Sequence, residues 1–185
     1  SIELGRYIEY TIQYRGKKKV TGSITPSYTQ ENFWLPQHGE FKHAASKAGL
    51  AAAPSVAIKR LNFTITKNVE DDRVIGNVDQ IDILNRAFAV EGSIELNYED
   101  NTFADFLLND TPRAIQITLT NPDVIVGVSS NPKLLFEFAK VKLSEVAKTQ
   151  DNNEIVRQTL SFKSFYSLSD AQSLRAILTN LQASY

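Results

Sequence analysis

Regular alternation of apolar and polar residues over residues 87–99 constrains this chain more than any other feature. The apolar positions are Phe88, Val90, Ile94, Leu96 and Tyr98, and the polar ones are Glu91, Ser93, Glu95 and Asn97. Side chains of a strand point alternately to its two faces, so this period of two predicts a half-buried strand. Gly92 falls among the apolar positions and indicates a bulge or a close backbone approach.

Further segments have a composition or an alternation that is typical of strands. Val, Ile, Thr, Phe, Tyr and Trp together make up nearly a third of the 185 residues, which favours sheet. Residues 8–14 alternate, with Ile8, Tyr10, Ile12 and Tyr14 on one face, and 20–28 is expected to return as a second strand. The remaining predicted strands are 58–68, 74–84, 113–121, 124–128, 133–145 and 154–166. We therefore expect a mainly β protein.

Only one helix is clearly indicated. Residues 102–109 combine an apolar stripe at helical spacing with Thr102 as the expected N-cap and Asp105 three residues later, a pattern that resembles a capping box. The C-terminal residues 168–181 fit a helix slightly better than a strand when only their local pattern is considered.

A long irregular excursion is expected over residues 29–55, which mix Pro, Gly, Ala and Ser around one aromatic cluster. Connections this long inside a compact domain are usually functional or mobile. The cluster, Phe33, Trp34 and Leu35, either plugs the end of the core or anchors a neighbouring subunit. The basic run 17–19 is either a solvated turn or a contact to an acidic partner.

The sequence contains few residues or motifs that would indicate a catalytic or metal-binding site. The chain has no Cys, and its only two His, His38 and His43, are five residues apart with Glu40 as the only carboxylate between them. This spacing does not resemble a zinc site, and no nucleophile elbow or Gly-rich phosphate loop is present. The acidic triplet of Glu70, Asp71 and Asp72 lacks calcium-loop spacing and is expected to be a solvated turn or an electrostatic surface feature. We therefore expect no enzyme, no cofactor and no metal.

Charge and hydropathy exclude two further classes. The net charge of −1 argues against a protein that binds nucleic acid by neutralising phosphates. No apolar run approaches the ~20 residues of a membrane helix, so we expect no membrane partner. The pattern is that of a sheet-rich building block or a binding module.

The order of elements from about residue 54 onward resembles that of one structural family. The resembling features are a strand at 58–66, an acidic connection, Val74-Ile-Gly76, the strand 88–98 followed directly by the helix 102–109, two long strands, and a short final segment at 174–180. In this order they are similar to the tail tube (major tail) proteins of long-tailed, non-contractile bacteriophages.

The resemblance implies a structural virion protein with a β-sandwich or barrel core and one flanking helix. Residues 1–185 would form a single domain of this type, with 29–55 as an inter-subunit loop. Copies would assemble in the host cytoplasm into stacked rings, expected to be homohexameric, whose sheets join into a hollow tube. Other tail proteins would be partners, and DNA would pass through the lumen without specific binding, as in DNA ejection. The resemblance also implies that the C-terminal segment is a strand.

A lumen that lets DNA slide should not be strongly basic, because basic side chains would hold the phosphates. The polar face of strand 87–99 carries Glu91, Glu95 and Asn97 and no base, so we expect it to face the channel. The acidic triplet 70–72 is a second candidate, and exposure of Glu91 and Glu95 to bulk solvent is the alternative.

A different class of function is a β-sandwich adhesion or carbohydrate-binding module. It would need a cluster of exposed aromatic side chains, for which Phe33 and Trp34 are the only candidates. The N-terminal residues do not resemble a secretion signal, which weighs against this alternative.

Overall fold

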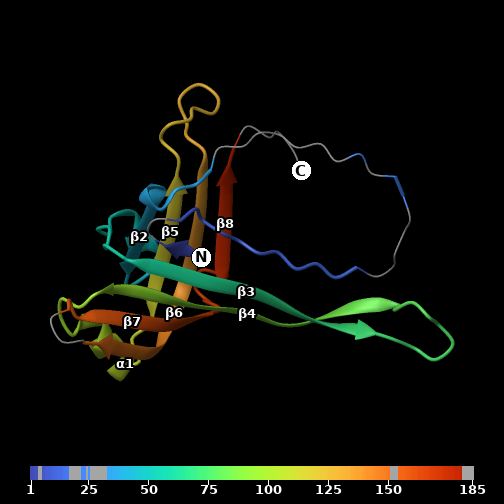
Figure 1. Ribbon diagram of the computed structural model, residues 1–185. Coiled ribbons are helices and arrows are strands. Elements are labelled where there is room, and N and C mark those ends of the chain that lie inside the picture. Colours follow the sequence, from blue (N-terminus) through green and yellow to red (C-terminus); the bar gives the residue numbers. More distant parts are fainter. Residues whose placement is uncertain (4–5, 17–21, 24, 26–32, 151–153, 181–185) are drawn as a thin grey trace.

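The computed structural model describes residues 1–3, 6–16, 22–23, 25, 33–150 and 154–180. The described chain is mainly β with one short α-helix (Figure 1). Its strands are β1 (Ile2–Glu3), β2 (Gly39–Ala44), β3 (Arg60–Asp72), β4 (Asp82–Asn97), β5 (Arg113–Thr120), β6 (Lys133–Thr149), β7 (Arg157–Phe165) and β8 (Leu174–Thr179). Its helices are α1 (Thr102–Leu108) and the 3-10 turns η1 (Pro36–His38) and η2 (Lys47–Ala51).

The strands form one curled sheet whose path is β1-β3-β4-β7-β6-β5-β2, with β8 also paired to β6. Strand β6 takes part in two layers. Its residues 133–138 pair with β8 and its residues 133–141 with β5, whereas residues 140–149 pair with β7. We call the β2, β5, β8 and N-terminal β6 part layer A, and the β1, β3, β4, β7 and C-terminal β6 part layer B. Figure 1 shows the strands of layer B running crosswise to those of layer A.

Register irregularities accompany this change of layer. The β6–β7 pairing shifts between Leu143 and Glu145, and the β5–β6 pairing shifts between Arg113 and Ile115. An extra residue in one strand bends it and increases its local twist. Orthogonal sheet packings turn their corners in this way, with strands that switch sheets through bulges.

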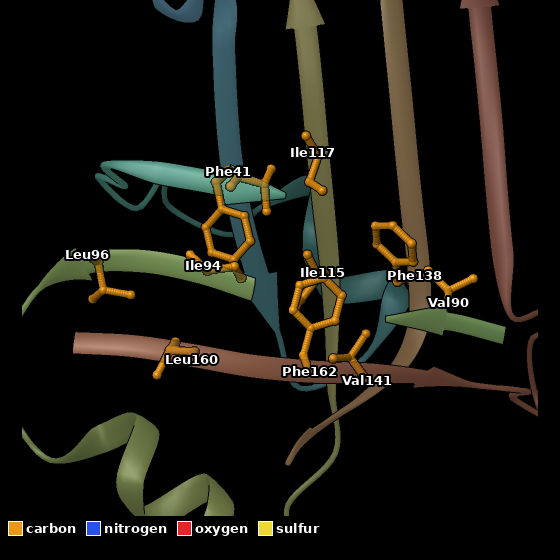
Figure 2. Packing of buried hydrophobic residues seen from close by; sticks show 11 residues of the cluster. Phe41, Val90, Ile94, Leu96, Ile115, Ile117, Phe138, Val141, Leu160 and Phe162 are labelled. Atoms are coloured by element: carbon orange, nitrogen blue, oxygen red, sulfur yellow. The ribbon is translucent and has the colours of Figure 1, made fainter. Parts of the chain in front are cut away.

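The core lies between the two layers. Figure 2 shows Phe41 and Ile117 of layer A facing Ile94 and Phe162 of layer B. All four are at most 2% exposed, and Phe138 of β6 is fully buried with its ring centroid 6.1 Å from that of Phe162. The expected mainly β sandwich or barrel with one short helix is confirmed.

Helix α1 is confirmed at its predicted place, but its N-terminus differs from the prediction. Asn101 is the N-cap instead of Thr102, and no side chain caps the helix. The backbone N–H of Thr102 donates to the Asp100 carboxylate at 2.8 Å, a hydrogen bond that lowers the pKa of Asp100. The capping box expected from Thr102 and Asp105 is therefore wrong, because a carboxylate two residues earlier takes the first free N–H.

Aromatic and cationic side chains from layer A hold α1 in place. The ring centroid of His43, on β2, lies 5.3 Å from that of Phe103 on the helix. The Arg113 guanidinium, on β5, lies 4.4 Å from the ring centroid of Phe106 and donates to Nδ1 of His43 at 3.1 Å. A helix of seven residues depends on such packing.

The N-terminal strand predicted over residues 8–14 is wrong. This segment forms no strand, and the side chains of Tyr10, Ile12 and Tyr14 are 80%, 58% and 85% exposed. Its alternation is real, but no described strand of the same chain lies beside it to complete a ladder. Most of the return strand predicted over 20–28 lies outside the described residues, and so does the basic run 17–19.

Residues 58–84 also differ from the prediction. They do not form two strands with an acidic connection, because β3 continues through Asp72 and the turn falls at residues 73–81. The far end of this β3–β4 hairpin extends well beyond the rest of the sheet, and we call residues 66–86 the arm (Figure 1). The charged residues of this stretch suggested a solvated loop. Paired strands can also carry charged residues on their exposed faces, so the charges did not exclude a strand.

Two shorter predictions need correction and one is confirmed. The excursion 29–55 is not irregular throughout, because Gly39–Ala44 forms β2 and pairs with β5. The predicted strand 124–128 is reduced to a single bridge between Val126 and Ser130. The C-terminal segment is the strand that the resemblance implied, since Leu174–Thr179 pairs with β6.

Replacing Gly92 by Ala should destabilise the fold by about 2 kcal/mol or more, because overpacked interiors rearrange at that cost. A Cβ at this position would lie 2.5 Å from the Asn62 carbonyl oxygen and 2.6 Å from a Phe162 ring carbon. Urea denaturation measures the effect. The matched control is Gly16→Ala, where no atom lies within 4 Å, and equal midpoints for the two variants would contradict the close approach.

Acidification should loosen the docking of α1. Burial, and secondly the Arg113 charge, lower the pKa of His43 below its ordinary value of 6.5. The unfolded chain therefore binds a proton that the folded chain resists, so stability present at neutral pH is lost as pH falls below about 6.5. We expect the urea midpoint to fall less between pH 7.5 and 5.5 in His43→Asn, whose amide oxygen still accepts from Arg113, than in the parent. An identical fall in both proteins would contradict the assignment.

Candidate functional site

The polar surface of layer B is the candidate site, and strand register builds it. Thr64 of β3 pairs with Glu91, which pairs in turn with Lys163 of β7. Paired residues share a face, so every second residue of β3, β4 and β7 points away from the core. This outward face carries Arg60, Asn62, Thr64, Glu91, Ser93, Glu95, Asn97, Arg157, Thr159, Ser161 and Lys163.

Cations from the neighbouring strand balance the two predicted glutamates. The Lys163 ammonium lies 2.8 Å from the Glu91 carboxylate, and the Arg157 guanidinium lies 3.1 Å from that of Glu95. The expectation that Glu91, Glu95 and Asn97 share one face is met. The outward face, which we call the wall, is charge-balanced, because β7 supplies a base for each of the two glutamates and the third base, Arg60, pairs with Glu3 of β1 at 2.6 Å.

Short hydroxyl and amide side chains lie between these ion pairs. The Ser93 hydroxyl and backbone N–H both donate to the Asn62 side-chain oxygen, at 3.0 and 3.2 Å. Six side chains of this face are exposed to solvent in the described chain: Arg60, Asn62, Thr64, Glu91, Arg157 and Lys163. The outward face of layer A is different, since η2 packs against β2, β5 and β6 and buries Leu50 there.

The acidic triplet lies apart from Glu91 and Glu95. Glu70, Asp71 and Asp72 are strand residues of the arm, at least six positions beyond Thr64 and therefore roughly 20 Å further along β3. Glu70 pairs with Arg86 at 3.4 Å, and Asp71 lies 3.5 Å from Arg15. The triplet is thus neither a turn nor part of the balanced wall.

The aromatic cluster of residues 33–35 lies beside the N-terminal segment. Phe33 is 72% exposed and its ring centroid is 5.3 Å from that of Tyr7, whereas Trp34 and Leu35 are half-buried. The Trp34 carbonyl accepts the Ile8 N–H at 3.4 Å, and the Leu35 N–H donates to His38 Nδ1 at 3.2 Å. Trp34 and Leu35 therefore pack partly against the chain, whereas the ring of Phe33 is exposed to solvent.

The two histidines have separate surroundings. His38 is buried with Nε2 3.9 Å from an Asp123 oxygen, whereas His43 faces Arg113 and α1. No group of three or more His, Cys, Asp or Glu within the described ranges is arranged to hold a metal. Among the helices that the structure describes, none is long and apolar enough to cross a membrane.

Sequence reasoning missed Lys163 and Arg157. Their strand shows the required alternation, with Arg157, Thr159, Ser161 and Lys163 at every second place, so their shared face could have been deduced. What local pattern does not show is that β7 pairs with β4, because about 60 residues separate the two strands in the sequence and long-range pairing leaves no short-range signal.

Comparison with family models gives one match. The model described as phage tail tube protein matches residues 1–164. A comparison with curated protein sequences found no match.

Solved structures share the fold at low sequence identity. A chain of the anti-feeding prophage baseplate, from a six-fold symmetrised reconstruction, is 14% identical with a TM-score of 0.54; the match covers 84% of this chain and 97% of that one. A chain of the native gene transfer agent virion is 9% identical with a TM-score of 0.51, covering 78% and 97%. A chain from the sheath-tube complex of an extracellular contractile injection system is 10% identical with a TM-score of 0.51, covering 76% and 88%.

Proposed function

The chain belongs to the phage tail tube family, and from this premise we propose that it forms stacked homohexameric rings whose shared lumen conducts DNA. The protein is a structural tube protein and a virion component. The match to the family model, which spans residues 1–164, carries this conclusion. The alternative of an adhesion or carbohydrate-binding module is not favoured.

Ring assembly is supported by the strand edges. Unpaired edges expose backbone N–H and C=O groups and invite association, and closure of a sheet into a barrel removes them. The six-fold description of one similar assembly supports six copies per ring. We propose that residues 1–185 act as one tube domain, that assembly takes place in the host cytoplasm, and that other tail proteins bind the ends of the tube.

We propose that the balanced wall of layer B lines the lumen. Its side chains are polar, and more than half of those on β3, β4 and β7 are exposed to solvent in the described chain. The acidic triplet 70–72, on the arm, is the second candidate for a lumen-facing surface.

A balanced wall suits a conducting channel. Each Lys or Arg that is free to neutralise a phosphate releases counterions and strengthens DNA binding. Glu91 and Glu95 keep Lys163 and Arg157 occupied, so the wall offers few free cations and no dense negative charge. DNA would meet hydroxyl, amide and paired groups and would slide without being held. We propose no chemical step, cofactor or metal.

Phe33, with Trp34 and Leu35 beneath it, is a candidate subunit contact. An aromatic ring that is 72% exposed beside a second exposed ring, Tyr7, is a typical anchor for an interface.

Negative-stain electron microscopy of the purified chain should show rings or tubes with a stain-filled centre as concentration rises. Phe33→Ser should shorten or abolish the tubes without changing the free energy of unfolding of the monomer, measured by urea denaturation, by more than about 0.5 kcal/mol, because exposed side chains contribute little to folding. Particles that remain monomeric at all concentrations and salt conditions, and also in the presence of preformed tail ends, would contradict the proposal.

Glu91→Lys combined with Glu95→Lys should make assembled tubes retain DNA. The change adds cations and frees Lys163 and Arg157, so we expect about tenfold more nuclease-protected duplex DNA at low salt, lost at high salt. Glu91→Gln with Glu95→Gln should act in the same direction and more weakly.

The matched control places the same charge change elsewhere, as Glu40→Lys with Glu154→Lys. DNA bound outside the tube by this control should remain open to nuclease. Equal protection by the control and the lumen variant, or none by either, would contradict the assignment of the wall.

A further inference from the structure

Residues 10–14 belong to no helix or strand, and they have no hydrogen-bond partner within the described part of the chain. The segment is anchored before and after: the Glu9 N–H donates to the Ser1 carbonyl at 3.2 Å, and Gln80 Nε2 donates to the Gly16 carbonyl at 2.7 Å. Between these anchors, residues 10–14 make no hydrogen bond with the part of the chain that the structure describes. Both backbone edges of this stretch of β-branched and aromatic residues are thus open with respect to the described residues.

The side chains of this segment are arranged for a sheet. Tyr10, Ile12 and Tyr14 share one face, and Thr11 and Gln13 share the other. Exposing both faces of such a segment to water is unfavourable, because its apolar face is stabilised only when it is buried. The anchors have already removed part of the conformational entropy that ordering a strand would cost.

Strand β8 offers a matching edge. It pairs with β6 along one side, and no other described strand lies along its second side. Leu174, Ala176 and Leu178 continue the apolar face of layer A, where Leu178 is still 51% exposed. The six residues of β8 span about 20 Å, which the seven residues 8–14 can cover.

The free edge of β3 along the arm fits less well. On the arm, Glu70 and Asp71 are neighbours in β3 and therefore lie on opposite faces. A strand added there would place its apolar side chains against a carboxylate whichever face they occupied. At β8, the polar face of the segment, with Glu9 at its beginning, would lie beside Arg175, which pairs with Glu137 at 3.6 Å in its own chain.

We propose that residues 8–14 of one copy add as an outer strand to β8 of a neighbouring copy. The addition extends layer A by one strand, closes the open edge of β8 and buries Tyr10, Ile12 and Tyr14 beside Leu174, Ala176 and Leu178. The inference rests on the proposed self-assembly and names the surfaces through which it takes place.

Disulfide cross-linking of full-length single-Cys variants tests the pairing, since the parent chain contains no Cys. Tyr10→Cys is mixed with a mass-tagged partner that carries Leu174→Cys, Ala176→Cys or Leu178→Cys, and the mixture is oxidised under assembly conditions. Paired residues on one face bring their Cβ atoms within about 5 Å, close to disulfide geometry. We expect a heterodimer with at least one of these partners.

The matched controls are Arg175→Cys and Ile177→Cys, which lie on the same strand but on its other face. Because faces alternate, neither should form a heterodimer with Tyr10→Cys in any register, parallel or antiparallel. Circular dichroism of each variant confirms that the fold is retained.

Three results would overturn the inference. They are the absence of a heterodimer with all three same-face partners, equal cross-linking with the opposite-face controls, and an intrachain disulfide in a chain that carries both substitutions. Electron microscopy of the same samples separates the two proposals. Tubes without the cross-link reject the strand addition and leave the tube function in place, whereas the cross-link without tubes supports the pairing and counts against the tube.

Discussion

The passage of one strand, β6, through both layers is the constraint on which the rest of the structure depends. Residues 133–141 build layer A with β5 and β8, and residues 140–149 build layer B with β7. Because the chain is continuous through the bend, the two layers cannot slide apart, and Phe138 and Val141 near the bend are buried between them. The polar face of layer B points outward only because its apolar face is committed to this core.

Elements with a strong local pattern could be predicted, and elements defined by a distant partner could not. The alternation around Glu91 and Glu95 predicted both the strand and its polar face, and the apolar stripe 103–107 predicted α1. The basic side chains that balance the glutamates depend on which strand lies beside β4. A pattern with a period of two carries no information about the identity of that neighbouring strand. Strand β8 shows the same limit, because its residues fit a helix locally and become a strand through β6.

The failed prediction at residues 8–14 is informative for the same reason. A strand needs an edge as well as a pattern, and a described edge for this segment is missing within its own chain. The arm poses the related problem of a two-stranded ribbon, which is marginally stable alone in water. Ile75 and Val78 at its turn are fully exposed. Both features are uncovered in the described chain, which agrees with the proposed contacts between copies.

In the proposed tube, charge balance would let the wall of layer B enclose DNA without holding it. Exposed ion pairs contribute little to folding, typically below about 1 kcal/mol, so stability alone gives little reason to place Lys163 opposite Glu91 and Arg157 beside Glu95. These ion pairs instead change the electrostatic potential at the surface of layer B. A tube repeats its wall many times over, and even one unpaired cation per subunit would accumulate into a continuous phosphate-binding track. In the proposed tube, pairing each base within its own subunit would prevent that accumulation at every level of the stack, whatever the length of the tube.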